Sequence, residues 1–243
     1  MIGHTEYEHD PASGTWAQRE YTRTLLSRVL SANRDVLSRL TLFQSHTLNR
    51  IESAAGTDLA QFCQRGARDA TISHEVFSML LAELSQPDRP PVLFAVDCLN
   101  FLMQNSDYRD PDFNLIHAHD LAIPRQFLDF LNGTRAFPQG LIIGATSAAG
   151  APRTDAFEYA IRGWKLPAYS KLDTRIAPSI AGAEVVRVGA MAEEEAKSLL
   201  EYCRVSGLLR EGSPLDDEQV AQRVATSSGL PKELVAGCVR MLA

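Results

Sequence analysis

Several common functional signatures are missing from the sequence. No apolar run approaches the roughly 18 residues that a membrane-spanning helix needs. The first residues, "MIGHTEYEHDP", are acidic and polar, which is unlike a signal peptide or an arginine-rich transit peptide. No two cysteines lie close together in sequence, so we expect buried free thiols rather than disulfides. The cysteines are Cys63, Cys98, Cys203 and Cys238.

Positive charge is also scarce, and lysine in particular. The 243 residues include 24 lysines and arginines against 30 aspartates and glutamates, which gives a formal net charge of −6. Proteins that bind nucleic acid through their own field are usually basic, so free-standing, high-affinity binding is not expected; a local basic face inside an assembly stays open. None of the lysines follows a glycine, so the phosphate-binding loop G-x-x-x-x-G-K-[ST] is absent. The lysines are Lys165, Lys171, Lys197 and Lys232.

Two histidines, His117 and His119, have the H-x-H spacing of a metal half-site. In amidohydrolase barrels such a pair begins a zinc site, and later strands add further histidine ligands. No histidine follows His119 here, so the sequence predicts no metal site. The alternative is a polar turn that leads into a helix, with the pair near Asp120 helping the helix to start.

Two apolar segments predict buried strands of a parallel sheet. Residues 92–96, in "PPVLFAVDCLNFL", and residues 141–145, in "LIIGATSAAG", do not alternate with polar residues, which is typical of strands covered on both faces. Asp97 follows the first strand, and Thr146 and Ser147 follow the second, at the same expected sheet edge. In nucleotide-binding proteins such an aspartate faces phosphate-bound Mg²⁺, and AAA+ nucleotidases place a polar γ-phosphate sensor there. Otherwise Asp97 caps a loop, and Thr146 and Ser147 start a turn.

Helical patterns surround these strands. Thr15 and Gln18 match a T-x-x-Q capping box before a long amphipathic helix that runs to about residue 40. Shorter helices are predicted over residues 57–65, 73–84, 118–132 and 154–162. Residues 105–114 are expected to form a polar loop, residues 164–183 a long loop of the kind that is often functional, and residues 184–188 a third strand.

The C-terminal pattern is purely helical, with helices expected over residues 193–204, 216–226 and 231–241. In "SSGLPKEL", Lys232 follows a G-x-P turn, which is similar to the start of the lid helix of AAA+ nucleotidases. Cys98 follows Asp97 where AAA+ hydrolases carry a water-activating glutamate, so no catalytic residue is predicted. The predicted fold class is α/β. Residues 16–190 are expected to form an incomplete AAA+-like core with a parallel sheet between helices, residues 191–243 a small helical lid, and residues 1–15 a disordered or linker start.

Five segments together resemble the mitochondrial small-ribosomal-subunit proteins of the death-associated-protein-three family, also called the S-twenty-nine ribosomal proteins, and their fungal branch in particular. The segments are "LLSRVLSANRDVLSRL", "RPPVLFAVDCLNFLMQNSDY", "FNLIHAHDLA", "GATSAAGAPR" and "SSGLPKELVAGCVRML". Their order matches, and the resemblance extends from about Trp16 to the C-terminus.

The resemblance implies an AAA+-like, GTP-binding core in the head of the mitochondrial small subunit, in the matrix and near the subunit interface. It implies Asp97 as the Mg²⁺-side carboxylate and Thr146 or Ser147 as the sensor, with a looser match of Lys232 to a basic lid residue. Family members carry a transit peptide and a Walker-A strand upstream of the helix at residues 18–40, and bind GTP or GDP with Mg²⁺; this sequence begins after both segments. We therefore expect this chain alone to bind no cofactor.

The resemblance also implies partners: other mitochondrial small-subunit proteins, ribosomal RNA and a bridge to the large subunit, with no membrane. The leading hypothesis is a structural constituent of the mitochondrial small ribosomal subunit that supports mitochondrial translation. The alternative is a truncated AAA+-related ATPase or signalling module, which Cys98 disfavours. Because the family core places the Walker-A strand beside residues 92–96, we expect that strand to lack a neighbour on one side and the isolated chain to be unstable or prone to aggregation.

Overall fold

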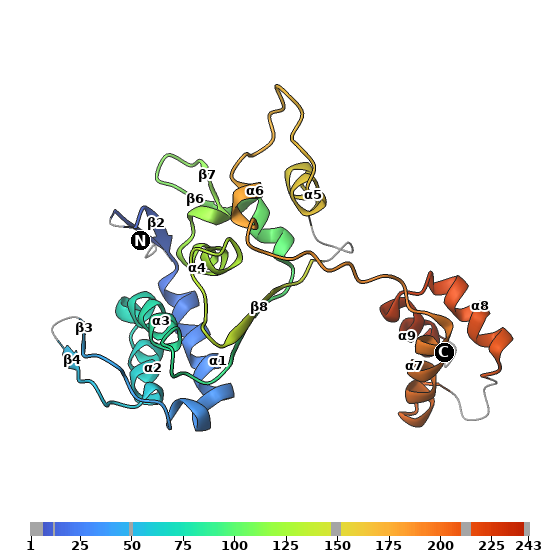
Figure 1. Cartoon of the computed structure of the whole chain (residues 1–243), viewed down its shortest axis with the longest axis horizontal. Coiled ribbons are helices and arrows are strands. Elements are labelled where there is room, and N and C mark those ends of the chain that lie inside the picture. The colour runs from blue at the N-terminus through green and yellow to red at the C-terminus, as the bar shows by residue number, and fades with distance from the viewer. Residues whose placement is uncertain (1–6, 12, 49–50, 147–151, 210–214, 241–243) are drawn as a thin grey trace, which may run out of the picture. The chain divides into compact units, whose positions relative to one another are not determined.

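The chain divides into two compact units, Met1–Glu184 and Val185–Ala243 (Figure 1). The structure, a computed structural model, describes residues 7–11, 13–48, 51–146, 152–209 and 215–240. The first unit combines helices with short sheets, and the described part of the second unit is helical apart from its connections, so the fold class is α/β as predicted. None of the described helices is both long and apolar enough to cross a bilayer.

The elements of the first unit alternate between helices and short strands. Its helices are α1 (Arg19–Leu37), α2 (Leu59–Arg68), α3 (Ala70–Leu84), α4 (Ala122–Leu131), α5 (Asp155–Arg162) and α6 (Ile176–Ser179), with the 3-10 turns η1 (Leu99–Met103) and η2 (Ala118–Asp120). Its strands are β1 (Glu8–Asp10), β2 (Thr15–Ala17), β3 (His46–Leu48), β4 (Ile51–Ser53), β5 (Val92–Val96), β6 (Asn105–Arg109), β7 (Leu115–His117) and β8 (Gly140–Gly144).

The strands β5 and β8 form a parallel pair in the middle of this unit. Val92 lies opposite Gly140 and Val96 opposite Gly144, and the crossover between the strands contains α4. Glycine is needed at position 140 because a Cβ there would lie 2.6 Å from the carbonyl oxygen of Val92. Both predicted strands and the helix between them are confirmed.

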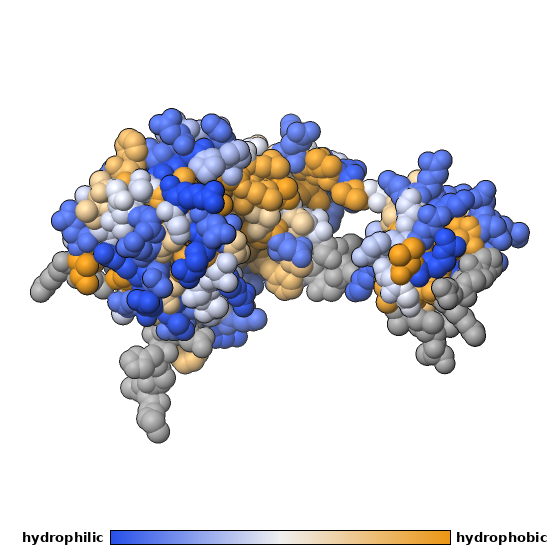
Figure 2. Space-filling model, turned by 90° about the horizontal axis from the view of Figure 1, so that it is seen from below, coloured by the Kyte–Doolittle hydropathy of each residue, from blue (hydrophilic) through white to orange (hydrophobic). Residues whose placement is uncertain are grey.

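The prediction that this sheet is covered on both faces is wrong. On one face, Phe94 contacts Phe127 and Phe130 of α4 edge-on, with ring centroids 5.1 and 6.0 Å apart. On the other face, apolar side chains stay exposed, and a view from below shows an apolar patch on this side of the unit (Figure 2). They are Leu93 (65% exposed), Leu141 (58%) and Ile143 (42%). Among the described residues β5 pairs with β8 alone, so the expected missing neighbour is confirmed.

The helices α1, α2 and α3 pack together and form the largest apolar core. Leu26, Phe62 and Val76, one from each helix, are fully buried where the helices meet. Gly66 allows the close approach, because a Cβ on it would lie 2.6 Å from Leu26 and 2.8 Å from Val76. These helices confirm the periodicity argument, and their observed ends differ from the predicted ones by a few residues.

Several local predictions are wrong. Gln18 precedes α1 but its side chain makes no capping bond, and Thr15 lies in β2, so no capping box forms. Part of the expected disordered start forms β1, which pairs with β2. The expected polar loop at residues 105–114 contains β6, which pairs with β7. Residues 184–188 form no strand, and the long loop at residues 164–183 contains α6.

The second unit contains α7 (Glu193–Val205), α8 (Asp217–Ser227) and α9 (Pro231–Arg240), which confirms its three predicted helices. Its small core includes Leu200, Val220 and Leu234. Cys203 and Cys238 belong to this core as free thiols, and Cys63 is buried in the first unit. Cys98 is only half-buried, so the prediction of buried free thiols holds for three of the four cysteines.

A buried carboxylate, Glu83 near the end of α3, fixes the loop that follows α1. Its Oε2 accepts hydrogen bonds from the backbone N–H of Phe43 at 2.8 Å and from Arg89 Nη2 at 2.6 Å, and its Oε1 lies 2.9 Å from His46 Nε2. Arg89 also donates to the carbonyl oxygen of Thr41 at 2.7 Å. Burial alone acts to raise the pKa of Glu83, but these donors outweigh it and the pKa lies below its ordinary value.

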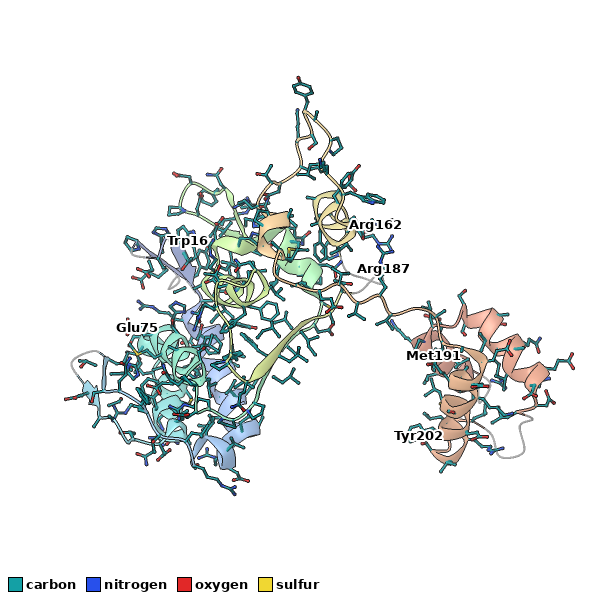
Figure 3. The ribbon with its side chains drawn as sticks, in the orientation of Figure 1. Trp16, Glu75, Arg162, Arg187, Met191 and Tyr202 are labelled. Carbon is teal, nitrogen blue, oxygen red and sulfur yellow. The ribbon has the colours of Figure 1, made fainter. Side chains whose placement is uncertain are left out.

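We predict that Glu83→Ala lowers the free energy of unfolding by about 3 kcal/mol, because it leaves buried donors and a cation without their partner. Glu75→Ala is the matched control, since Glu75 is exposed on the same helix (Figure 3) and should change stability by less than about 0.5 kcal/mol. Urea melts measure both. The Glu83 contribution is present above the ordinary glutamate pKa of about 4.3 and is lost as the pH falls through the lower folded-state pKa. A variant Glu83→Gln with the parent's acid sensitivity would contradict this assignment.

We also predict that Leu93→Lys reduces aggregation of the isolated chain with little change in its melting temperature, because Leu93 lies on the exposed sheet face. Phe94→Lys, one residue along the same strand, should instead unfold the unit, because Phe94 packs on α4. Light scattering during a thermal melt measures both properties. A monomeric parent chain that melts cooperatively above roughly 60 °C would refute the expected instability.

Candidate functional site

The carboxyl-terminal edge of the β5–β8 pair brings together two of the predicted site residues. Asp97 directly follows β5, and Thr146 lies two residues beyond β8. Backbone hydrogen bonds join the two loops: the N–H of Ala145 donates to the carbonyl oxygen of Val96 at 2.9 Å, and the N–H of Leu99 donates to that of Ala145 at 2.7 Å. The parallel pairing therefore fixes both loops at one edge, as the sequence predicted.

Asp97 is exposed at this edge. Its Oδ1 accepts a hydrogen bond from the N–H of Cys98 at 2.7 Å, and no ion pair to it occurs in the described part of the chain. Cys98 has a left-handed backbone with φ of 55°, which turns the chain sharply after the carboxylate. Partial burial and the neighbouring Asp97 raise the pKa of the Cys98 thiol. A neutral thiol at this position is a poor base for activating water.

The other two predicted site residues belong to other parts of the chain. Ser147 lies outside the described residues. Lys232 is exposed in α9 of the second unit, which is described by itself. Of the predicted site residues described in the first unit, the edge presents one carboxylate and one hydroxyl.

These residues do not make up a complete nucleotide site. Asp97 and Thr146 are suitable for the Mg²⁺ side of a bound nucleotide, but the chain has no G-x-x-x-x-G-K-[ST] loop to hold the phosphates. Within the described residues, no three histidine, cysteine, aspartate or glutamate side chains are grouped closely enough to hold a metal ion. No chemical step is therefore assigned to this edge.

His117 and His119 form a structural turn, as the alternative interpretation of the H-x-H motif predicted. The N–H of His119 donates to His117 Nδ1 at 3.1 Å and caps η2, which leads into α4. The rings meet edge-on with centroids 4.5 Å apart. Burial lowers the pKa of both, with His117 and Arg175 adding to the effect at His119, whose pKa falls to about 4. Both imidazoles are therefore neutral at physiological pH.

A network next to this turn could not be found from the sequence. His117 Nε2 lies 3.5 Å from Asp173, and Arg175 pairs with Asp173 at 2.9 Å and with Asp120 at 3.2 Å. The hydrogen bond from Arg175 lowers the pKa of Asp173, and Asp173 in turn raises the pKa of Arg175. These side chains come from segments more than fifty residues apart, so no local pattern signals the network. It fixes one end of the loop between α5 and α6.

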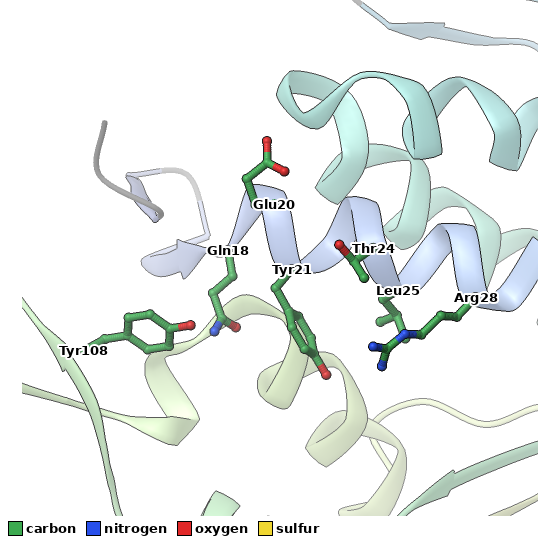
Figure 4. A pocket seen from close by; sticks show the side chains of 7 residues that line it. All are labelled: Gln18, Glu20, Tyr21, Thr24, Leu25, Arg28 and Tyr108. Atoms are coloured by element: carbon green, nitrogen blue, oxygen red, sulfur yellow. The ribbon is translucent and has the colours of Figure 1, made fainter. Parts of the chain in front are cut away.

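A shallow groove of about 270 Å³ lies along α1 (Figure 4). It is lined by Gln18, Glu20, Tyr21, Thr24, Leu25, Arg28 and Tyr108. Neither Asp97 nor Thr146 lines it, and its volume is at the lower limit for small-molecule pockets. The groove is therefore separate from the sheet edge.

Comparison with known proteins gives one family and two curated relatives. The family described as "Mitochondrial ribosomal death-associated protein 3" matches residues 1–237. The "Small ribosomal subunit protein mS29" of Neurospora crassa is 34% identical over 235 residues, which cover 90% of this chain and 50% of that protein. The protein of the same name from Schizosaccharomyces pombe is 24% identical over an alignment of length 244, which covers 98% of this chain and 50% of that protein. The chain thus spans about half the length of the curated relatives it matches.

We predict that Asp97→Asn changes the free energy of unfolding by less than about 1 kcal/mol, because Asp97 is exposed and accepts only a local hydrogen bond. Asp58→Asn serves as a reference, since Asp58 caps α2 by accepting from the N–H of Gln61 at 2.7 Å and caps usually contribute about 1 kcal/mol. Urea melts compare the two variants. A loss of several kcal/mol in Asp97→Asn would give Asp97 a structural role instead.

Proposed function

The chain belongs to the mitochondrial ribosomal death-associated protein 3 family, and from this premise we propose that it is a structural constituent of the mitochondrial small ribosomal subunit. The family match, which covers residues 1–237, is the observation that carries the proposal. The printed names of both relatives agree with it. The proposed location is the head of the small subunit in the mitochondrial matrix. There the chain contacts other small-subunit proteins, ribosomal RNA and the large subunit, and it supports translation.

The proposal includes a nucleotide-binding type of core. The parallel β5–β8 pair and the polar edge at Asp97 and Thr146 support an AAA+-like arrangement in which Ser147 adds to the sensor. In this proposal, α7–α9 correspond to a lid that carries Lys232. In this proposal GTP or GDP with Mg²⁺ is the ligand of the family core, and the residues of this chain alone are expected to bind neither, because they include no G-x-x-x-x-G-K-[ST] loop to hold the phosphates.

The structural role fits the chemistry of the edge better than catalysis does. A hydrolase needs a base beside the nucleotide, and the residue after Asp97 is a half-buried cysteine whose pKa is raised. The alternative, a truncated AAA+-related ATPase or signalling module, has only Asp97 and the sheet edge in its favour.

Sucrose-gradient sedimentation tests the proposal. We expect the tagged chain, produced in the mitochondria of Neurospora crassa, to sediment with the small ribosomal subunit and to leave it only when the particle dissociates. A chain that stays at the top of the gradient would refute the ribosomal role. Calorimetry with GTP and ATP in Mg²⁺ buffer addresses the alternative, because a micromolar dissociation constant for the isolated chain would favour an active nucleotide site.

A further inference from the structure

The loop between α5 and α6, residues 163–175, projects away from the rest of the first unit (Figure 1). Trp164 is 55% exposed, and Tyr169 has a relative exposure of 103%, so its ring contacts little besides solvent. An aromatic ring that is wholly in water gains nothing from the hydrophobic effect. The hydrophobic effect therefore does not hold this ring in its position.

The backbone conformation at Tyr169 is also unfavourable for a residue with a large side chain. The N–H of Ser170 donates to the carbonyl oxygen of Pro167 at 3.1 Å, which closes a four-residue turn with Tyr169 at its third position. Tyr169 has φ of 65°, a left-handed conformation that glycine adopts freely and that is strained for a bulky side chain. Strain of this kind gathers at binding and active sites, where the side chain is needed for an external contact.

The loop is also a local concentration of positive charge. Two of the four lysines of the chain, Lys165 and Lys171, lie in it, and both are exposed. Neither forms an ion pair with any described residue. Arg162, at the end of α5 where the loop begins (Figure 3), is paired with Glu158 at 3.4 Å. Residues 163–175 therefore contain three cations against one aspartate, Asp173, in a chain whose formal net charge is −6.

Both ends of the loop are fixed to the first unit. At the start, the guanidinium of Arg162 lies 4.7 Å from the ring centroid of Trp164, whose ring meets Tyr159 edge-on. At the end, Arg175 pairs with Asp120 next to the His117 turn, and Ile176 is buried. A loop held at both ends presents its tip at a lower entropic cost on binding than a free segment.

We propose that this loop binds unpaired RNA, with a base stacked on Tyr169 and the adjoining phosphates held by Lys165 and Lys171. The proposal rests on the proposed function, since it takes the RNA of the ribosome as the partner. Stacking platforms flanked by cationic side chains are the usual means of binding single strands. Unpaired RNA fits better than a duplex, because a ring at the tip of a turn needs the face of an unstacked base.

The positive charge of the two lysines is complementary to an acidic protein segment as well as to RNA. The exposed ring distinguishes the two partners, because every nucleobase offers a flat face to stack on, whereas carboxylates offer none. RNA binding should therefore depend on the ring of Tyr169 and not on its hydroxyl. Binding to an acidic peptide should depend on the lysines and be insensitive to the ring.

Fluorescence anisotropy with a labelled oligouridine RNA and the full chain tests the ring. We expect Tyr169→Phe to bind as the parent does and Tyr169→Ala to bind about tenfold more weakly, because stacking contributes about 1–3 kcal/mol per base and 1.4 kcal/mol corresponds to tenfold. Tyr169→Gly is the sharpest variant: it removes the backbone strain, so its melting temperature should equal or exceed the parent's while its affinity falls like that of Tyr169→Ala. Unchanged affinity in Tyr169→Gly, or no measurable binding by the parent, would overturn the proposal.

The same assay tests the lysines through its salt dependence. Each phosphate contact on a single strand contributes about 0.7 to the slope of log affinity against log salt, so Lys165→Ala and Lys171→Ala should each reduce the slope by about that amount. Arg34→Ala is the control, because Arg34 is an exposed cation on α1 outside the loop, and its slope should match the parent's. A glutamate-rich peptide that binds as tightly as the RNA would assign the loop to a protein partner and overturn the proposal.

A photo-crosslink in the assembled particle separates this proposal from the proposed function. Benzoylphenylalanine replaces Tyr169 in the chain, with the same replacement at Tyr202, an exposed tyrosine of α7, as the control. We expect position 169 to crosslink to RNA in purified small subunits at several times the yield of position 202. Particles that contain the chain but give only protein crosslinks, or none, at position 169 would refute the loop assignment and leave the ribosomal role intact. Absence of the chain from the particles would refute the ribosomal role itself.

Discussion

The parallel pairing of β5 with β8 is the constraint on which the arrangement of the first unit depends. It closes the crossover that contains α4, it places Asp97 and Thr146 at one edge, and it gives Phe94 a surface on which to pack. Parallel sheets are stable when both faces are covered, yet here one face is open and each strand has a single described neighbour. Apolar side chains of the open face therefore stay exposed, and among the described residues the outer edge of each strand pairs with no further strand.

The sequence carried enough information for elements whose stabilising contacts are local or strongly apolar. The helices α1–α3 and α7–α9 show periodic apolar faces, and β5 and β8 are apolar throughout, so their type followed from the pattern. The short hairpins could not be predicted from an apolar pattern. A strand such as β6, with the sequence NSDYR, has no such pattern and forms because it pairs with β7. Residues 184–188 show the reverse case: a strand composition without a described partner forms no strand.

Some features of the candidate sites could likewise be predicted from the sequence, and others could not. Asp97 and Thr146 could be placed at one edge from the sequence, since the geometry of parallel strands dictates where loops meet. The contacts of Glu83 and of Arg175 could not, because each joins segments tens of residues apart that no motif connects. Tyr169 was equally hidden, since its significance lies in a backbone angle and not in its residue type. Long-range contacts and strain are properties of the folded chain, and a single sequence does not display them.

The negative net charge of the chain affects how the loop at residues 163–175 would bind RNA. A net charge of −6 repels a phosphate backbone at long range, so RNA approaches the protein most closely where cations gather. Lys165 and Lys171 provide such a place. The repulsion by the net negative charge then favours the orientation in which this loop faces the RNA. A uniformly basic protein would bind RNA through many faces. In the proposed complex, a basic and aromatic projection on an acidic protein favours one orientation of binding.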